Sequence, residues 1–417
     1  MRLKDWQNFS VNADRLRSDI ETLSEIGRSN DGTLYRPAFS PQYEEARIWL
    51  ASRLDAAGIQ NRNDAAGNLI GRVGQDGVPC IMSGSHIDTV PKGGALDGAY
   101  GVLAALEVAR VIKEAEIEYP KAFECVAFVD EEGRYFDGLG SKAISGDLSL
   151  DEVNTACDAA GNLLTTDMLA AGFDPNRILE AARAADEISA FVELHIEQGA
   201  VLDSLQTPLG NVESIVGTSN LWITFNGESN HSGTTPMELR RDAFTGAAEF
   251  TTRAREHILK QGTSGRVRIT YGIVELEPQS HNIIPERVRL FQEIREVSDE
   301  IKMQLVEDSK HLACEIADKH RLSVDFEHIP ETKAMAMSKR VRSAIADSAG
   351  KLKLELHNMP SGAVHDAQNL ARLTDSGMIF VPSKGGLSHC PEEYTDWRHL
   401  EQGANVLLHT VMRLIHD

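Results

Sequence analysis

The sequence predicts an α/β protein in which a larger domain, with a central mixed sheet flanked by helices, is interrupted by a smaller inserted domain. The first observation is that nearly continuous apolar strands alternate with helical patterns up to residue 213 and again after residue 330, as in sheets covered on both faces. The second is that the intervening pattern follows the order β-α-β-β-α-β, which is a compact sandwich of its own. The expected domains are 1–213 together with 330–417, and 214–329.

The elements of the larger domain are predicted from periodicity and from residues that start or stop helices. A helix over 41–58 begins with Pro41 after Ser40 and stops at Gly58. Further helices are expected over 11–29, 98–115, 151–156, 165–171, 175–185, 337–349, 363–373 and 395–415. Strands are expected over 67–73, 79–83, 121–129, 190–199, 353–357 and 377–381.

The inserted domain is predicted from the change of pattern near residue 213. Its strands are expected over 219–227, 265–277, 286–295 and 321–328. Its helices are expected over 238–260 and 297–318. Together these elements form a split βαβ arrangement.

Length and charge exclude several classes of protein. A chain of 417 residues suggests two or three domains, and its 41% hydrophobic and 25% charged residues are typical of a soluble globular protein. The formal net charge of −21 argues against a nucleic-acid partner and against an anionic membrane surface. We see no stretch near the ~20 apolar residues of a membrane span and no secretory signal, so we expect a cytoplasmic protein.

The segment GSHIDTVPKGGALDGAYG, residues 84–101, is the most informative part of the sequence. It follows a short apolar strand and contains His86, Asp88 two residues later, and Asp97 in a glycine-rich turn before a helix. A neutral imidazole and two carboxylates suit a hard-to-borderline divalent metal. Only one of His86 and Asp88 need contact metal, since the carboxylate can instead hold the second N–H of the imidazole. The two oxygens of Asp97 could bridge two metals.

Residues of the same chemical types recur at three further strand ends. Glu131 and Glu132 follow the strand 121–129, His195 lies within ELHIEQG, and His389 lies in the glycine-flanked loop GGLSHCPEE. Each residue alone has an ordinary interpretation as a core histidine, a turn or a solvated strand end. Here, however, four loops each follow a predicted strand and each carry such a residue with glycine nearby. This combination is difficult to obtain by chance.

Together these residues indicate metal-assisted hydrolysis of an amide-like bond. Two divalent ions a few ångströms apart can bind one water and bring its pKa towards neutrality. One member of the Glu131–Glu132 pair can bind metal while the other takes the proton and returns it to the leaving nitrogen. The sequence has no nucleophile elbow and no phosphate-binding loop that would compete with this interpretation.

The five cysteines are an alternative source of chemistry. They are scattered, with none in a C-x-x-C pair, which favours reduced thiols in a cytosol. Cys390 follows His389, but no other base or orienting group is evident for a catalytic thiol there. The cysteines are therefore interpreted as structural or incidental: Cys80, Cys125, Cys157, Cys314 and Cys390.

Seven segments closely resemble the hydantoinase/carbamoylase group of amidases, within the dinuclear-metal aminoacylase/carboxypeptidase superfamily. They lie between residues 84 and 395 and read GSHIDTVPKGGALDGAYGVLAALE, VDEEGRYF, ELHIEQG, SNHSGTTPM, HNIIP, SGAVHDAQ and GGLSHCPEEYT. LHIEQG and NHSGTTPM are specific to this group within the superfamily. The resemblance implies two divalent metal ions per subunit, with Zn²⁺ as the first expectation and Mn²⁺, Co²⁺ or Ni²⁺ as alternatives.

The resemblance also implies how the metal residues divide. The implied ligands form two sets that share a bridging Asp97: His86, Asp97 and His195 for one metal, and Asp97, Glu132 and His389 for the second. Glu131 is implied as the general base. Asp88 is implied as the partner that orients His86.

For the substrate, the resemblance implies contributions from both domains. The inserted domain is implied to be both a lid and a homodimerisation module. His231 is implied to polarise the scissile carbonyl in the active site of the partner subunit. The implied substrate contacts are Gln198, Asn282, Arg295 and Gly362, with Arg295 on the substrate carboxylate.

The leading functional hypothesis is hydrolysis of an N-carbamoyl-L-amino acid to amino acid, ammonia and carbon dioxide. Allantoate, which presents the same ureido and carboxylate groups, is the close alternative, and a dipeptidase or aminoacylase is the third. An inactive binding protein is disfavoured, because all five ligand positions and Glu131 hold competent residues. The substrate stays open, since Ser232 and Val364 stand where the group commonly has alanine and glycine.

Overall fold

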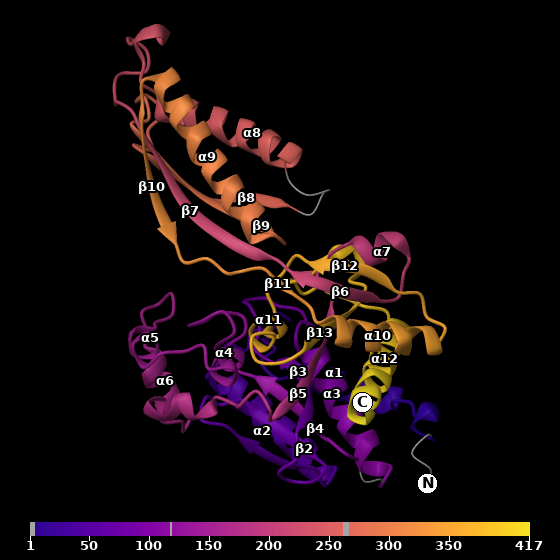
Figure 1. Cartoon of the computed structure of the whole chain (residues 1–417). Helices are drawn as coiled ribbons and strands as arrows, with labels where there is room; N and C mark the ends of the chain where they lie inside the picture. Colours follow the sequence, from indigo (N-terminus) through magenta and orange to yellow (C-terminus); the bar gives the residue numbers. More distant parts are fainter. Residues whose placement is uncertain (1–4, 117–118, 262–266) are drawn as a thin grey trace. The chain divides into compact units, whose positions relative to one another are not determined.

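The structure, a computed structural model, describes residues 5–116, 119–261 and 267–417 (Figure 1). Its contacts divide the chain into two units, Met1–Glu213 with Met337–Asp417 and Ser214–Ala336. The predicted division, at 213/214 and 329/330, differs from these bounds only at the second junction. Within the described residues, no helix is long and apolar enough to cross a membrane.

The first sheet is mixed, as predicted. In the described chain it has nine strands in the order β1-β2-β4-β3-β5-β13-β6-β11, with β12 paired to β6. The strands β3, β4, β5 and β13 pair in parallel, whereas β1, β2, β6 and β11 pair antiparallel to their neighbours. Their bounds are β1 Gln60–Asn63, β2 Leu69–Val73, β3 Cys80–His86, β4 Ala122–Phe128, β5 Ile188–Ile196, β6 Gly210–Ile215, β11 Met335–Ala336, β12 His357–Ser361 and β13 Ser376–Val381.

Helices cover both faces of this sheet, as its buried strands require. Neighbouring residues of β5 point to opposite faces of the sheet. Leu194 faces α12, where a Cβ added at Gly403 would lie 3.2 Å from its side chain. Glu193 faces α11, whose Ala367 amide donates a hydrogen bond to it. The α-helices are α1 Ala13–Leu23, α2 Pro41–Ala56, α3 Ala99–Glu114, α4 Leu139–Ser145, α5 Leu150–Thr155, α6 Leu164–Ala170, α7 Val201–Leu205, α10 Lys339–Lys351, α11 Asp366–Leu370 and α12 Trp397–His416. Short 3₁₀ helices span Asp5–Asn8, Pro175–Ala181 and Lys384–Gly386.

Several predicted elements differ from the structure. The strand expected over 353–357 is wrong, since Lys353 adopts a left-handed turn conformation after α10 and the strand begins at His357. The alternating leucines there pack partly buried against the core, which mimicked a strand pattern. The helix over 175–185 is a 3₁₀ helix, Pro175–Ala181. Strand β6 was not predicted, because its sequence GNVESI, with Val212 and Ile215 three residues apart, shows neither alternation nor a continuous apolar run.

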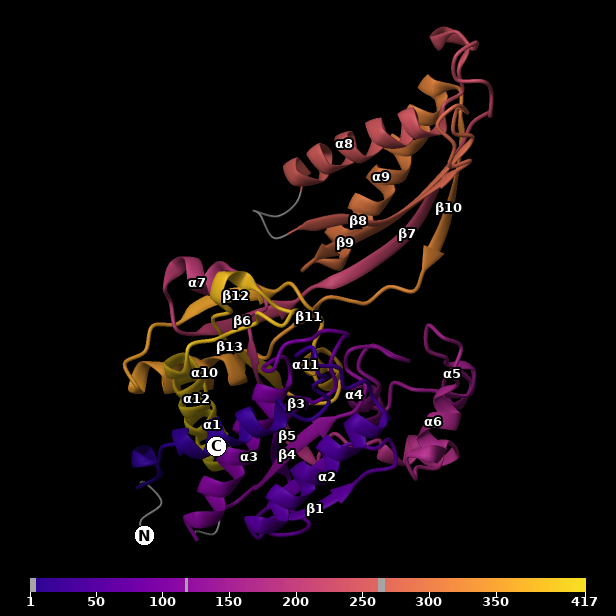
Figure 2. The same cartoon turned by 180° about the vertical axis from the view of Figure 1, so that it is seen from behind.

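The second unit has the predicted β-α-β-β-α-β order (Figure 2). Its four strands form an antiparallel sheet in the order β10-β7-β9-β8, and α8 and α9 cover one face. Residues 265–266 of the expected strand 265–277 lie outside the described residues. The bounds are β7 Gly217–Asn226, 3₁₀ helix Met237–Leu239, α8 Ala243–Gln261, β8 Arg268–Glu277, β9 Arg287–Glu296, α9 Asp299–His320 and β10 Ser323–Ile329.

The parallel strands of the first unit position the candidate site. The carboxyl ends of β3, β4, β5 and β13 meet at one edge of the sheet, where α/β proteins bind ligands. His86 is the last residue of β3, and His195 is the penultimate residue of β5. Glu131, Glu132 and His389 follow β4 and β13 in the adjoining loops.

Candidate metal centre

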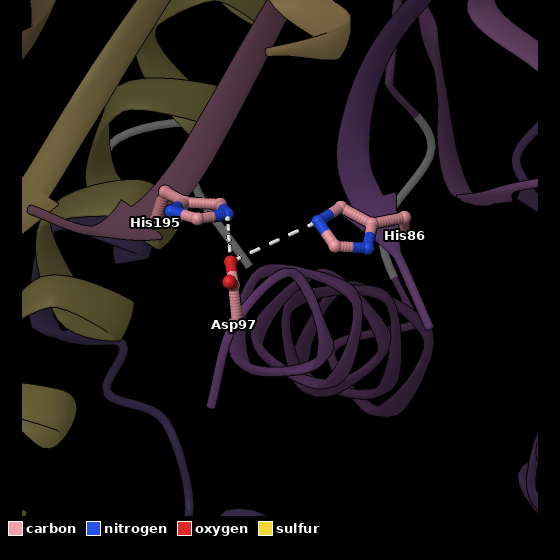
Figure 3. A group of neighbouring side chains, drawn as sticks. All are labelled: His86, Asp97 and His195. Carbon is pink, nitrogen blue, oxygen red and sulfur yellow. Dashed lines mark ion pairs between the residues drawn. The ribbon is translucent and has the colours of Figure 1, made fainter. Parts of the chain in front are cut away.

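Three buried side chains from separate elements face one another at this edge. Asp97 lies immediately before α3, and Figure 3 shows it pointing between the rings of His86 and His195. Its Oδ1 atom is 3.2 Å from Nε2 of His195 and 3.9 Å from Nε2 of His86. The donor atoms of the three residues all lie within 4.8 Å of one another, as in a metal-binding group.

A second group shares the same aspartate. Oδ2 of Asp97 is 3.0 Å from Nε2 of His389, which is 3.9 Å from Oε2 of Glu132. This group is less enclosed, because the His389 side chain is 49% exposed. The structure therefore brings together the five residues that the sequence singled out as ligands, with one oxygen of Asp97 turned towards each group.

A glycine after Asp97 lets the His86 ring approach the backbone closely. Gly98 has a φ of 61°, and a Cβ there would lie 2.3 Å from Nε2 of His86. Glu393, which the sequence did not single out, holds the same turn by accepting the amides of Leu96 and Asp97 through Oε1. Its place in GGLSHCPEE, four residues after His389, was the signal that could have found it.

Backbone carbonyls orient both imidazoles of the first group. Nδ1 of His86 is 3.0 Å from the carbonyl oxygen of Asp88, and Nδ1 of His195 is 2.8 Å from that of Ile196. With the Nδ1 protons donated to these carbonyls, the Nε2 atoms are directed towards Asp97.

Asp88 was expected to orient His86 through its carboxylate, but it does so through its backbone carbonyl. The carboxylate is 3.7 Å from Nδ1 of His86, because the chain turns after β3 and presents the Asp88 carbonyl instead. The carboxylate accepts the backbone amides of Glu131 and Glu132, at 3.4 and 3.0 Å. Asp88 thus joins the loop after β3 to the loop after β4.

The carboxyl groups of this centre lie close together and are largely buried. Burial, reinforced by nearby carboxylates, raises the pKa of Glu131 and of Glu132 well above the ordinary range. Burial opposes ionisation of Asp97 too, but hydrogen bonds to His195 and His389 hold its pKa well below normal. Within the described residues, Oε1 of Glu132 is buried with no hydrogen-bond partner. Converging imidazole nitrogens and unbalanced carboxylates fit divalent cations.

Glu131 lies beside the first group without belonging to either. Its Oε2 atom is 3.4 Å from Nε2 of His86, and its side chain is 11% exposed. Gln198, expected to contact substrate, lies at the centre and donates from Nε2 to both oxygens of Asp97 at 3.0 Å. Gly362 follows β12 in the first unit, with nothing within 4 Å of the Cβ that an alanine would add.

A third group of metal-type residues adjoins His195 and was not predicted. Glu193 accepts the Ser85 hydroxyl at 2.7 Å and the Ala367 amide at 2.8 Å. The His365 ring contacts the His195 ring edge-on, with 4.6 Å between centroids, and burial keeps the pKa of His365 well below normal. The signal for Glu193 was its spacing of two from His195, which puts both on one face of β5.

The remaining predicted residues belong to the second unit. His231 and Asn282 lie together there, since the Ser232 amide donates to the Asn282 carbonyl and His231 bridges Ile283. Arg295 lies on β9, where its Nε donates to Glu293 at 2.8 Å.

Comparisons with known proteins agree on one family. The model of peptidase family M20/M25/M40 matches residues 82–413. An N-carbamoyl-L-amino-acid amidohydrolase of Paenarthrobacter aurescens is 35% identical over 406 residues, covering 96% of this chain and 98% of the relative. An allantoate amidohydrolase of Bacillus subtilis (strain 168) is 34% identical over 402 residues, covering 95% and 96%.

Solved structures resemble the chain along its full length. The crystal structure of an amidase of the hydantoinase/carbamoylase family from Burkholderia multivorans has a TM-score of 0.90 and 29% identity, and the match covers 98% of this chain and 99% of that one. The mixed α/β fold with a helix-flanked sheet is therefore shared. Similar identities to relatives with two different substrates leave the substrate to be argued from the site.

Proposed function

The chain belongs to peptidase family M20/M25/M40, and on that premise we propose that it is a dinuclear metal-dependent amidohydrolase of N-carbamoyl-L-amino acids. The relatives support a hydrolase that acts on C–N bonds. The proposed reaction cleaves the ureido C–N bond and yields the amino acid, ammonia and carbon dioxide. The observation that carries the proposal is the pair of ligand groups sharing Asp97, with Glu131 beside them.

Each group would hold one divalent cation. His86, Asp97 and His195 would hold the first, and Asp97, Glu132 and His389 the second. When bound, cations such as Zn²⁺, or alternatively Mn²⁺, Co²⁺ or Ni²⁺, would acidify a water and polarise the ureido carbonyl. Asp88 would keep Glu131 and Glu132 in place through their backbone amides.

Glu131 would be the general base. It is largely buried, it lies outside both ligand groups, and burial raises its pKa well above the ordinary range. A carboxylate that lies beside the ligand groups without belonging to them can both take and return a proton. Glu131 would take the proton of the attacking water and deliver it to the leaving nitrogen.

The hydrogen bonds of His231 suit its proposed role. Its Nδ1 atom accepts the backbone amides of Gly233 and Thr234, at 3.0 and 3.2 Å. A neutral ring with Nδ1 as acceptor carries its proton on Nε2. The exposed His231 can therefore donate a hydrogen bond to the carbonyl oxygen of a ureido group.

His231 and Arg295 of one chain are too far apart to bind the same small substrate. Arg295 pairs with Thr218 at one end of β7, whereas Asn226, at the other end, leads into the loop that carries His231. The eight steps along the strand from Thr218 to Asn226 span about 27 Å of antiparallel strand. We therefore propose that Arg295 binds the substrate carboxylate in one subunit, while His231 and Asn282 come from the other.

The second unit offers an edge for the proposed homodimer. β8 is an edge strand of its sheet, and Ile273 and Val274 on it are 49% and 54% exposed. An exposed apolar edge strand can pair with a second copy. Phe244 and Leu259, on the neighbouring helix α8, are also exposed.

Complementation tests the shared site. Glu131→Gln and His231→Ala should each be inactive, because one removes the base and the other the carbonyl donor. Co-expressed, they should recover about a quarter of wild-type activity, since half of randomly formed dimers would carry one intact site. Co-expression of Glu131→Gln with Asp97→Asn is the matched control and should stay inactive, because both changes lie in the same unit. No recovery in purified mixed dimers would contradict a site built from two subunits.

Turnover of two ureido substrates tests the reaction itself. Metal-loaded protein should release ammonia from N-carbamoyl-L-amino acids, and a chelator should abolish this until cations are restored. Allantoate, assayed side by side, is the second candidate, favoured by the similar identity to an allantoate amidohydrolase. Faster turnover of allantoate would make allantoate the proposed substrate and N-carbamoyl-L-amino acids the alternative. Absence of ammonia from both, with a dipeptide cleaved instead, would overturn the ureido proposal.

A further inference from the structure

A cavity of about 340 Å³ opens beside Glu132, entirely within the first unit. Hydrocarbon forms much of its wall, from the loop before α2, the loop after β3 and the turn after α5: Tyr35, Pro37, Ala38, Val90, Pro91 and Ala160. Its volume lies near the lower end of the range of about 300–1,000 Å³ seen for small-molecule sites. The cavity can therefore take a group the size of an amino-acid side chain.

Arg134 also lines the cavity, but its charge is already balanced. Its guanidinium donates to Asp158 at 3.0 Å and to Asp167 at 2.7 Å. A third donor reaches the carbonyl oxygen of Ala38 at 2.6 Å. Because two carboxylates occupy its donors, Arg134 is a poor site for a substrate carboxylate. It instead links the loop before α2 to the turn after α5 and to α6.

The other charged groups in the wall are also engaged by the protein. The Asp158 carboxylate accepts the Ala160 and Asn162 amides, at 3.0 and 2.9 Å. Asp88 accepts the amides of Glu131 and Glu132. Glu132 lines the cavity and belongs to the second ligand group. A substrate held at that group has the cavity beside it, and the wall offers mainly apolar contact.

We propose that this cavity binds the apolar side chain of the N-carbamoyl-L-amino acid, an inference that rests on the proposed function. Burial of hydrocarbon here stabilises the bound substrate in proportion to the apolar area removed from water. Allantoate carries a second ureido group in place of a hydrocarbon side chain. In this cavity that group would lose its hydrogen bonds to water with few replacements. The cavity therefore selects N-carbamoyl amino acids with side chains such as that of leucine.

Filling the cavity tests this selection. We expect the wild-type protein to hydrolyse N-carbamoyl-L-leucine with a kcat/KM at least about tenfold above that for N-carbamoylglycine, since single methylenes in apolar pockets change this ratio by about 10- to 200-fold. Ala160→Trp should remove most of this difference in kcat/KM, because it should lower kcat/KM for N-carbamoyl-L-leucine and leave that for N-carbamoylglycine unchanged. Ala160 is exposed at the rim, so the larger side chain should not disturb the core.

Two further variants complete the experiment. Ala170→Trp places the same side chain on an exposed position of α6 outside the cavity and should leave the leucine-to-glycine ratio unchanged. Ala160→Asp should lower the ratio by adding a charge without bulk. Equal rates on both substrates in the wild type, or an equal loss on both in Ala160→Trp, would overturn the cavity proposal alone. A wild-type protein that hydrolyses no ureido acid would overturn the proposed function as well.

Discussion

Glu131→Gln should lower kcat on an N-carbamoyl-L-amino acid by about 10²–10⁴-fold while the content of bound metal stays unchanged. The amide keeps the size of the side chain but cannot take a proton from water. Glu131 lies outside both ligand groups, so its loss removes no metal ligand. Steady-state kinetics and elemental analysis of the same preparation measure the two quantities.

Glu132→Gln is the matched control, because it makes the same chemical change at the next residue. Glu132 belongs to the second ligand group, and its Oε2 faces His389. We expect this variant to lose one cation per chain as well as activity. If Glu131→Gln instead lost metal, or kept more than a tenth of wild-type kcat, Glu131 would not be the base.

Asp97→Asn should abolish activity and remove both cations. Asp97 is the only residue common to the two groups, with Oδ1 facing His195 and Oδ2 facing His389. An asparagine has one oxygen and a donor NH₂ in their place, so it cannot ligate on both sides. It also removes the negative charge that two neighbouring divalent cations require. Metal content per chain should fall from two towards zero, while the circular dichroism spectrum stays that of the folded protein.

His389→Ala provides the comparison, since His389 belongs only to the second group and its side chain is 49% exposed. This variant should keep one cation, held by the buried group with His86 and His195. Two cations retained in Asp97→Asn would contradict the bridging role. One cation lost from each variant would show instead that the two groups bind independently.

The chemistry-bearing residues could be predicted because their context is local. An apolar run such as 121–129 identifies a buried strand, and the polar residues that follow it must lie at the sheet edge. The glycine-rich turn around Asp97 could also be recognised in the sequence. Why Gly98 must be glycine needed coordinates, which show that a Cβ there would lie 2.3 Å from Nε2 of His86. Where a pattern was ambiguous over five residues, as at 353–357, packing of leucines onto the core decided against a strand.

The amino-acid order alone was enough to establish an α/β fold with an insertion, the family resemblance and a set of ligand types at strand ends, because periodicity and motifs are properties of short segments. Three-dimensional packing decided which oxygen of Asp97 faces which histidine, and it placed the Asp88 carbonyl, rather than the carboxylate, against His86. Packing also built the cavity, where Arg134 joins Ala38, Asp158 and Asp167. These contacts join residues far apart in the chain. Their geometry depends on the twist of the sheet and on how closely the helices and loops pack against it, and no local sequence pattern encodes either.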